Sequence, residues 1–175
     1  MNEVIKTIQS RKSIRKYSGE PFPEGDLQEI LKTGFSAPSA GNRQPWRVVI
    51  VKDRNRRHQL ATAAFGQSFI AQAPVILVVC AVPYESAERY KERGATLYAF
   101  QDTAALTQNM LLAAHALGYA TCWIGAFDEA EVSKIIKAPK GMRPVSMVPI
   151  SHFDGKDSPG RPRRPFGEVV IEEEF

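Results

Sequence analysis

The aliphatic run at residues 74–82 constrains the fold of this chain more than any other feature of the sequence. It lacks the alternating polar side chains of a half-exposed strand, so it predicts a strand that is covered on both faces. Such a strand needs helices on both sides of its sheet. Residues 96–117 predict one of them, because apolar residues recur there at three- and four-residue steps on more than one face, which is typical of a long helix buried in the core.

The other predicted elements fit an α+β domain in which one sheet lies between helical layers. Periodicity and capping residues predict further helices at residues 2–10, 23–34, 53–65 and 128–136, and further strands at 47–52, 119–124 and 145–150. The remaining segments predict a short charged surface insertion at 84–94, a proline-rich loop or arm at 151–165, and a terminal edge strand at 168–175.

Length and composition favour a single domain over residues 1–175. A chain of 175 residues, 43% apolar and 24% charged, has enough material to bury a sizeable core. Its formal net charge of +4 is too small to demand a nucleic-acid partner, and it suits a protein that binds anionic cofactors. The sequence shows neither a secretory signal nor an apolar run long enough to span a bilayer, so we expect a cytoplasmic protein without a membrane partner.

Two basic clusters near opposite ends of the chain predict an anion site. The first is R-K-S-I-R at residues 11–15, and the second is R-P-R-R at residues 161–164. Guanidinium groups suit phosphate oxygens because they present paired donors, and a serine hydroxyl adds another donor. Either cluster alone would more often be a solvated face of the protein, so the prediction depends on the two acting together.

A third segment, S-A-P-S-A-G-N-R-Q-P-W at residues 36–46, is rich in small and amide residues and directly precedes an apolar strand. In this order the three segments resemble those of the nitroreductase family of FMN-dependent flavoproteins, over nearly the whole chain. The resemblance implies a central mixed, mainly antiparallel sheet flanked by helices, with a long buried helix and a C-terminal arm that reaches the partner of a homodimer. It also implies FMN at the dimer interface and NAD(P)H as electron donor.

The resemblance further assigns cofactor-binding roles to residues of this chain. The FMN phosphate and ribityl chain would be held by the two basic clusters, through Arg11, Lys12, Ser13, Arg15, Arg161 and Arg163. The neighbouring subunit would contribute Pro38, Ser39 and Asn42. The flavin ring would lie along Trp123, Ile124 and Gly125, with Gln67 at its pyrimidine end. Plain core packing is the alternative role for Trp123.

No other chemistry has a motif in this sequence. The dinucleotide fingerprint G-x-G-x-x-G is absent, so NAD(P)H would have to reach the flavin directly. The 3 histidines lack the spacing of metal ligands, and no nucleophile motif is present, so we predict no metal site and assign no catalytic side chain. A flavin carries the electrons itself, while the protein binds, orients and tunes it.

The leading hypothesis is an FMN-dependent oxidoreductase that passes a hydride from NAD(P)H through FMN to a small-molecule acceptor, such as a nitroaromatic or quinone, by a ping-pong mechanism. One alternative is a specialised flavoenzyme of the same fold, such as a dehalogenase or a flavin-consuming enzyme. It stays open because the 84–96 insertion is short for the family and because Gly125 replaces a glutamate of some members. The other alternative is a non-enzymatic module that binds nucleic acid through Arg54, Arg56, Arg57 and the second cluster.

Overall fold

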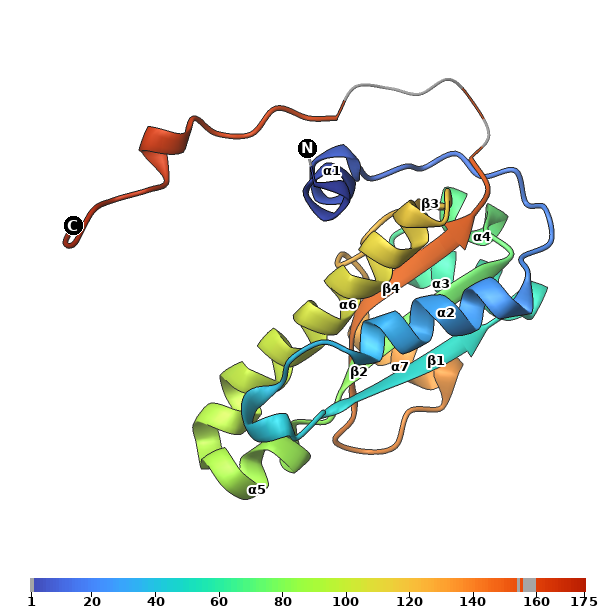
Figure 1. The fold of residues 1–175 in the computed structure, drawn as a ribbon. Coiled ribbons are helices and arrows are strands. Elements are labelled where there is room, and N and C mark those ends of the chain that lie inside the picture. Colours follow the sequence, from blue (N-terminus) through green and yellow to red (C-terminus); the bar gives the residue numbers. More distant parts are fainter. Residues whose placement is uncertain (1, 154, 156–159) are drawn as a thin grey trace.

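The chain folds into a sheet that lies between two layers of helices (Figure 1). The structure is a computed structural model, and it describes residues 2–153, 155 and 160–175. The described strands are β1 (Trp46–Val51), β2 (Val75–Ala81), β3 (Ala120–Thr121) and β4 (Arg143–Ser151), arranged in the order β1-β2-β4-β3. Each neighbouring pair is antiparallel, which confirms the expected α+β class with a mainly antiparallel sheet.

Both faces of the sheet are covered, as the aliphatic run predicts. One face carries α2 (Glu24–Phe35) and α6 (Ala99–Ala116), and the other carries α3 (Arg54–Ala63), α4 (Phe69–Gln72) and α7 (Glu129–Ile136). Strand β2 contributes to both cores, because Leu77 and Val79 pack with α2 and α6 while Ile76 and Val78 pack with α3, α4 and α7. All 7 residues of β2 are buried.

Helix α6 is the buried helix predicted at residues 96–117. Leu106 and Met110 are fully buried against α2 and the sheet. Its 18 residues make it about 27 Å long, so segments that contact its two ends lie far apart. None of the helices in the described ranges is both long and apolar enough to cross a membrane.

The segment before α6, predicted only as a short charged surface insertion, is helical. It forms α5 (Pro83–Arg93), which continues through a π-helical turn at Gly94–Tyr98 into α6. Proline at the first helical position is compatible with a helix because the N–H of that position has no partner within the helix. Ser86 on α5 is fully buried, so the insertion has a packed face of its own.

The strand predicted at 119–124 is interrupted. Only Ala120 and Thr121 pair continuously with β4, and Ile124 makes an isolated bridge with Met147. In this register Pro149 stands opposite Cys122 and has no N–H to donate, which accounts for the break in the ladder. The interruption leaves the Trp123 side chain partly exposed beside β4.

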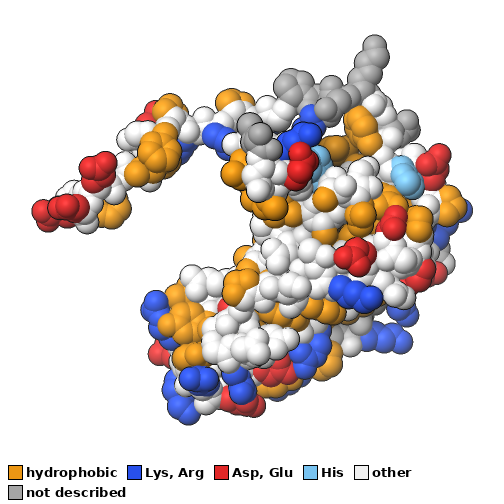
Figure 2. Space-filling model, in the orientation of Figure 1, with side chains coloured by type: hydrophobic (Ala, Val, Ile, Leu, Met, Phe, Trp, Pro, Cys, Tyr) orange, Lys and Arg blue, Asp and Glu red, His pale blue; other side chains and the backbone are white. Residues whose placement is uncertain are grey.

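The prediction of an edge strand at residues 168–175 is wrong for the single chain. A single 3₁₀ turn (Phe166–Glu168) is the one helical or strand element of the described C-terminal residues 160–175, which form an arm that extends away from the sheet (Figure 1). The arm projects into solvent with hydrophobic side chains along its length (Figure 2). A strand needs a sheet edge to pair with, and the arm does not return to an edge of its own sheet. Its predicted contact with a dimer partner stays a prediction.

Candidate functional site

A pocket of about 970 Å³ lies where the two basic clusters meet. Its walls come from the end of α1 (Glu3–Ser10) with residues 11–15, and from the C-terminal end of α6 with residues 118–120. Phe153, Gly160, Arg161 and Arg163 complete them. Every cofactor-binding residue predicted in the two clusters lines it, namely Arg11, Lys12, Ser13, Arg15, Arg161 and Arg163. The fold therefore brings together the two ends of the chain that the anion-site prediction requires.

The pocket is strongly positive. Among the described residues that line it, five are Lys or Arg and none is Asp or Glu. Arg11, Arg161 and Arg163 form no ion pair with a carboxylate in the part of the chain that the structure describes. Cations without paired carboxylates favour a bound anion, and guanidinium groups suit a phosphate in particular.

The first cluster is held in place through its backbone. The Arg11 N–H donates to the Thr7 carbonyl at 3.1 Å, which ends α1, and the Ile14 N–H donates to the Thr121 carbonyl at 2.9 Å. The Tyr17 hydroxyl then donates to the Ile14 carbonyl at 2.8 Å. These contacts fix the cluster against β3, and all five of its residues line the pocket.

The cations of the first cluster also act on a neighbouring thiol. Burial raises the pKa of the Cys122 thiol above its usual value, while Arg15, a hydrogen bond with Ser13 and Arg11 lower it. The positive charge of the first cluster therefore acts on Cys122, the residue directly before Trp123.

Two residues at and just after the C-terminal end of α6, His115 and Tyr119, also line the pocket, although the sequence did not single them out as functional. The His115 ring lies 2.7 Å from the Ser10 hydroxyl through Nε2, which ties α1 to α6. The Tyr119 hydroxyl donates to Asp26, and burial together with this contact raises the pKa of Tyr119 to about 12. The sequence gives His115 no metal-ligand spacing and so no functional role. Its place in the last turn of α6 was the available signal, because side chains there reach the helix end.

The predicted ring-binding residues lie next to the first cluster but outside its pocket. Trp123 and Gly125 line a second pocket of about 360 Å³, together with side chains of α6, and Ile124 is buried. Gln67 adjoins this segment, because its amide nitrogen donates to the carbonyls of Ala64 at 3.0 Å and Ala126 at 3.2 Å. The structure thus places Gln67 and residues 123–125 side by side.

The remaining predicted residues, Pro38, Ser39 and Asn42, lie far from the first pocket. Their loop is bound to the start of α6, where the Ala40 N–H donates to the Asp102 carboxylate at 3.1 Å. Asp102 and His115 are about 20 Å apart along the α6 axis, from the rise of about 1.5 Å per helical residue. One chain alone therefore does not bring this loop to the basic pocket.

Of the basic residues Arg54, Arg56 and Arg57, which the nucleic-acid alternative invokes, Arg57 has a structural role. The Arg57 guanidinium donates from Nη1 to the carbonyls of Ala71 at 2.8 Å and Ala73 at 2.5 Å. It therefore joins α3 to the segment before β2 and is not a free surface cation. In the described ranges, no group of three His, Cys, Asp or Glu side chains is suited to a metal ion.

Comparisons with known proteins identify the family. The Nitroreductase family model matches residues 8–68 and 59–152. An inferred NADH dehydrogenase/NAD(P)H nitroreductase of Archaeoglobus fulgidus is 38% identical, over 86% of this chain and 83% of the relative. The FMN reductase [NAD(P)H] of Bacillus subtilis is 32% identical, over 100% of this chain and 75% of the relative.

The structural comparison agrees. The solved structure of the NADPH:FMN oxidoreductase of Vibrio harveyi in complex with NAD+ superimposes with a TM-score of 0.91 at 28% identity, over 99% of this chain and 78% of that one. The family model, the relatives and the solved structure all indicate the same family. This chain belongs to the nitroreductase family.

Proposed function

We propose that residues 1–175 form one FMN-binding domain of an NAD(P)H-dependent oxidoreductase, with the FMN phosphate in the pocket between the two basic clusters. One observation carries this assignment: five cations and no carboxylate among the described residues that line the pocket. A phosphate monoester carries a charge of about −1.5 to −2 at neutral pH. The Bacillus subtilis and Vibrio harveyi proteins, both named for flavin reduction with NAD(P)H, support the cofactor and the donor.

The residues of this chain would bind and orient the cofactor. Arg11, Arg161 and Arg163 offer paired donors to phosphate oxygens. Trp123 and Gly125, which line the second pocket, would offer a wall for the ring. Gln67 already donates from its amide nitrogen, so its carbonyl oxygen is the group that would accept from a ring N–H. Bound FMN supplies the hydride transfer, from NAD(P)H to an acceptor such as a nitroaromatic or quinone. The cytoplasmic location stays a prediction.

We expect a homodimer whose two flavin sites combine the basic pocket of one subunit with the 38–42 loop of its partner. The loop is about 20 Å along α6 from the basic pocket of its own chain, so we expect the loop of a second copy to complete that end of the site. Apolar side chains of α1 and the arm, such as Val4, Ile8 and Val169, are exposed in the single chain and suit burial against that copy. Sedimentation at low micromolar concentration checks this, and a monomer with stoichiometric FMN would contradict it.

A ping-pong mechanism is the expected kinetic behaviour. The sequence has no dinucleotide fingerprint, so donor and acceptor would occupy the same flavin face in turn. Initial rates at varied acceptor concentration should give parallel double-reciprocal lines, with inhibition at high acceptor concentration. Intersecting lines, which require a ternary complex, would contradict the mechanism.

A further inference from the structure

The loop at residues 39–44 has an unusual backbone. Gly41, Asn42 and Gln44 all have left-handed conformations, with φ of 54°, 55° and 50°. For residues other than glycine this conformation costs roughly 1–3 kcal/mol, and it persists only where surrounding contacts enforce it. Contacts with neighbouring elements must therefore hold the loop in this conformation.

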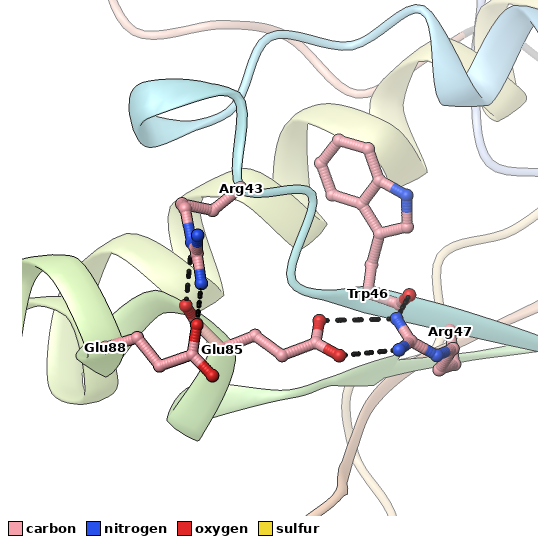
Figure 3. Close-up of polar contacts among 5 residues, drawn as sticks. All are labelled: Arg43, Trp46, Arg47, Glu85 and Glu88. Carbon is pink, nitrogen blue, oxygen red and sulfur yellow. Dashed lines mark hydrogen bonds and ion pairs between the residues drawn. The ribbon is translucent and has the colours of Figure 1, made fainter.

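Helix α5 holds one side of the loop through exposed contacts. Arg43 donates from Nε to the Glu85 carbonyl at 3.0 Å and pairs with the Glu88 carboxylate (Figure 3). The side chains of Arg43 and Glu88 are 33% and 63% exposed, and an ion pair with this exposure contributes about 1 kcal/mol or less. Arg47, beside the loop, donates from both Nη atoms to the Glu85 carboxylate (Figure 3).

Helix α6 holds the other side through a buried carboxylate. Asp102 is 6% exposed, and its Oδ1 accepts the Ala40 N–H at 3.1 Å. Its Oδ2 is buried and has no hydrogen-bond partner among the residues that the structure describes. This carboxylate is therefore shielded from water, and its one hydrogen bond within the described residues goes to the loop.

The charge of Asp102 opposes folding. Burial raises the pKa of this carboxyl above its usual value, and the Ala40 hydrogen bond only partly offsets the rise. A raised pKa means that folding disfavours the ionised form of this carboxyl, so ionised Asp102 lowers the free energy of unfolding. If Asp102 served packing alone, a neutral side chain of the same size would give a higher free energy of unfolding.

We propose that Asp102 is a positioning residue, whose buried carboxylate fixes the 39–44 loop in the conformation that meets the flavin of the partner subunit. The inference rests on the proposed function, which assigns Ser39 and Asn42 to that flavin. A hydrogen bond to a charged acceptor is stronger than one to a neutral acceptor, which explains why a carboxylate holds the strained loop at some cost in stability.

The test is the isosteric variant Asp102→Asn, which keeps an acceptor for Ala40 and removes the charge. FMN release from the loaded dimer, followed by the flavin fluorescence that appears on dilution, should accelerate about five- to tenfold, from the difference between charged and neutral hydrogen bonds. The urea midpoint of the flavin-free chain should rise in the same variant. A merely structural residue would lose stability and flavin together, so that result, or a variant that fails to fold, would overturn the inference.

Two further variants separate this inference from the proposed function. Thr107→Val removes a buried polar group from the same helix, a hydroxyl that bonds to Ser146 and not to the loop, and it should leave FMN release unchanged. Asn42→Gly removes the loop amide from a backbone conformation that glycine adopts freely. Faster release from Asn42→Gly with unchanged release from Asp102→Asn would overturn the role of Asp102 alone. Unchanged release from both would overturn the shared flavin site as well.

Discussion

Replacing Arg11 or Arg163 by alanine is expected to weaken FMN binding by about 10- to 150-fold. A hydrogen bond to a charged group contributes roughly 1.5–3 kcal/mol, and every 1.4 kcal/mol is about a factor of ten in affinity. Both arginines line the basic pocket, one from each end of the chain, and neither is paired with a described carboxylate. Fluorescence titration of the flavin-free variants measures the loss.

Riboflavin is the ligand control, because it has the flavin ring without the phosphate. Its affinity should scarcely change in either variant, whereas damage to the fold would weaken both ligands together. Arg164→Ala is the matched protein control, since Arg164 belongs to the second cluster and carries the same charge but does not line the pocket. Equal losses for FMN and riboflavin, or an equal FMN loss in Arg164→Ala, would show that the pocket does not bind the phosphate.

The largest expected effect on stability comes from the core of α6. Leu106 is fully buried between α2 and the sheet, and Leu106→Ala would leave a cavity there. Such truncations cost about 2–5 kcal/mol, a large share of the roughly 5–15 kcal/mol that stabilises a typical domain. Urea unfolding of the flavin-free chain should therefore show a clear fall in the free energy of unfolding.

Leu117 provides the matched control for this prediction. It follows the last turn of the same helix and is 43% exposed, so Leu117→Ala removes the same atoms without opening a cavity. Its expected effect is within about 0.5 kcal/mol. Similar losses for the two variants would mean that α6 does not form the core described above.

The layered fold could be predicted because its central elements carry unambiguous patterns. The aliphatic run became β2, buried along its whole length, and the helix predicted at 96–117 became α6. Both patterns report burial directly, and burial on two faces of a sheet leaves few alternative architectures. The two basic clusters were expected to meet because a high density of like charge favours an anion, and residues of both clusters do line one pocket.

What could not be predicted depends on contacts between distant segments. The amphipathic pattern at 84–94 does not reveal that α5 packs against the 39–44 loop, and the break of the strand at Cys122 follows from Pro149 on another strand. The C-terminal residues alternate as a strand would, but a strand forms only where an edge is available. Asp102 was missed because a single acid in an apolar helix shows its role only when its neighbours are known.

The central claim is that each flavin site takes its basic pocket from one subunit and its 38–42 loop from the other. A mixed dimer tests it most directly. One subunit carries Arg11→Ala with Arg163→Ala, and the other carries Ser39→Ala with Asn42→Gly. The two are expressed together with different affinity tags, so that the mixed dimer is purified away from both parent dimers, and its FMN binding is titrated.

A shared site predicts that the mixed dimer regains one FMN site with wild-type affinity and keeps one site with both defects. The two parent dimers should each bind FMN weakly at both sites. If pocket and loop act within the same subunit, every site in the mixed dimer carries a defect. Absence of any wild-type site in the mixed dimer would therefore contradict the account.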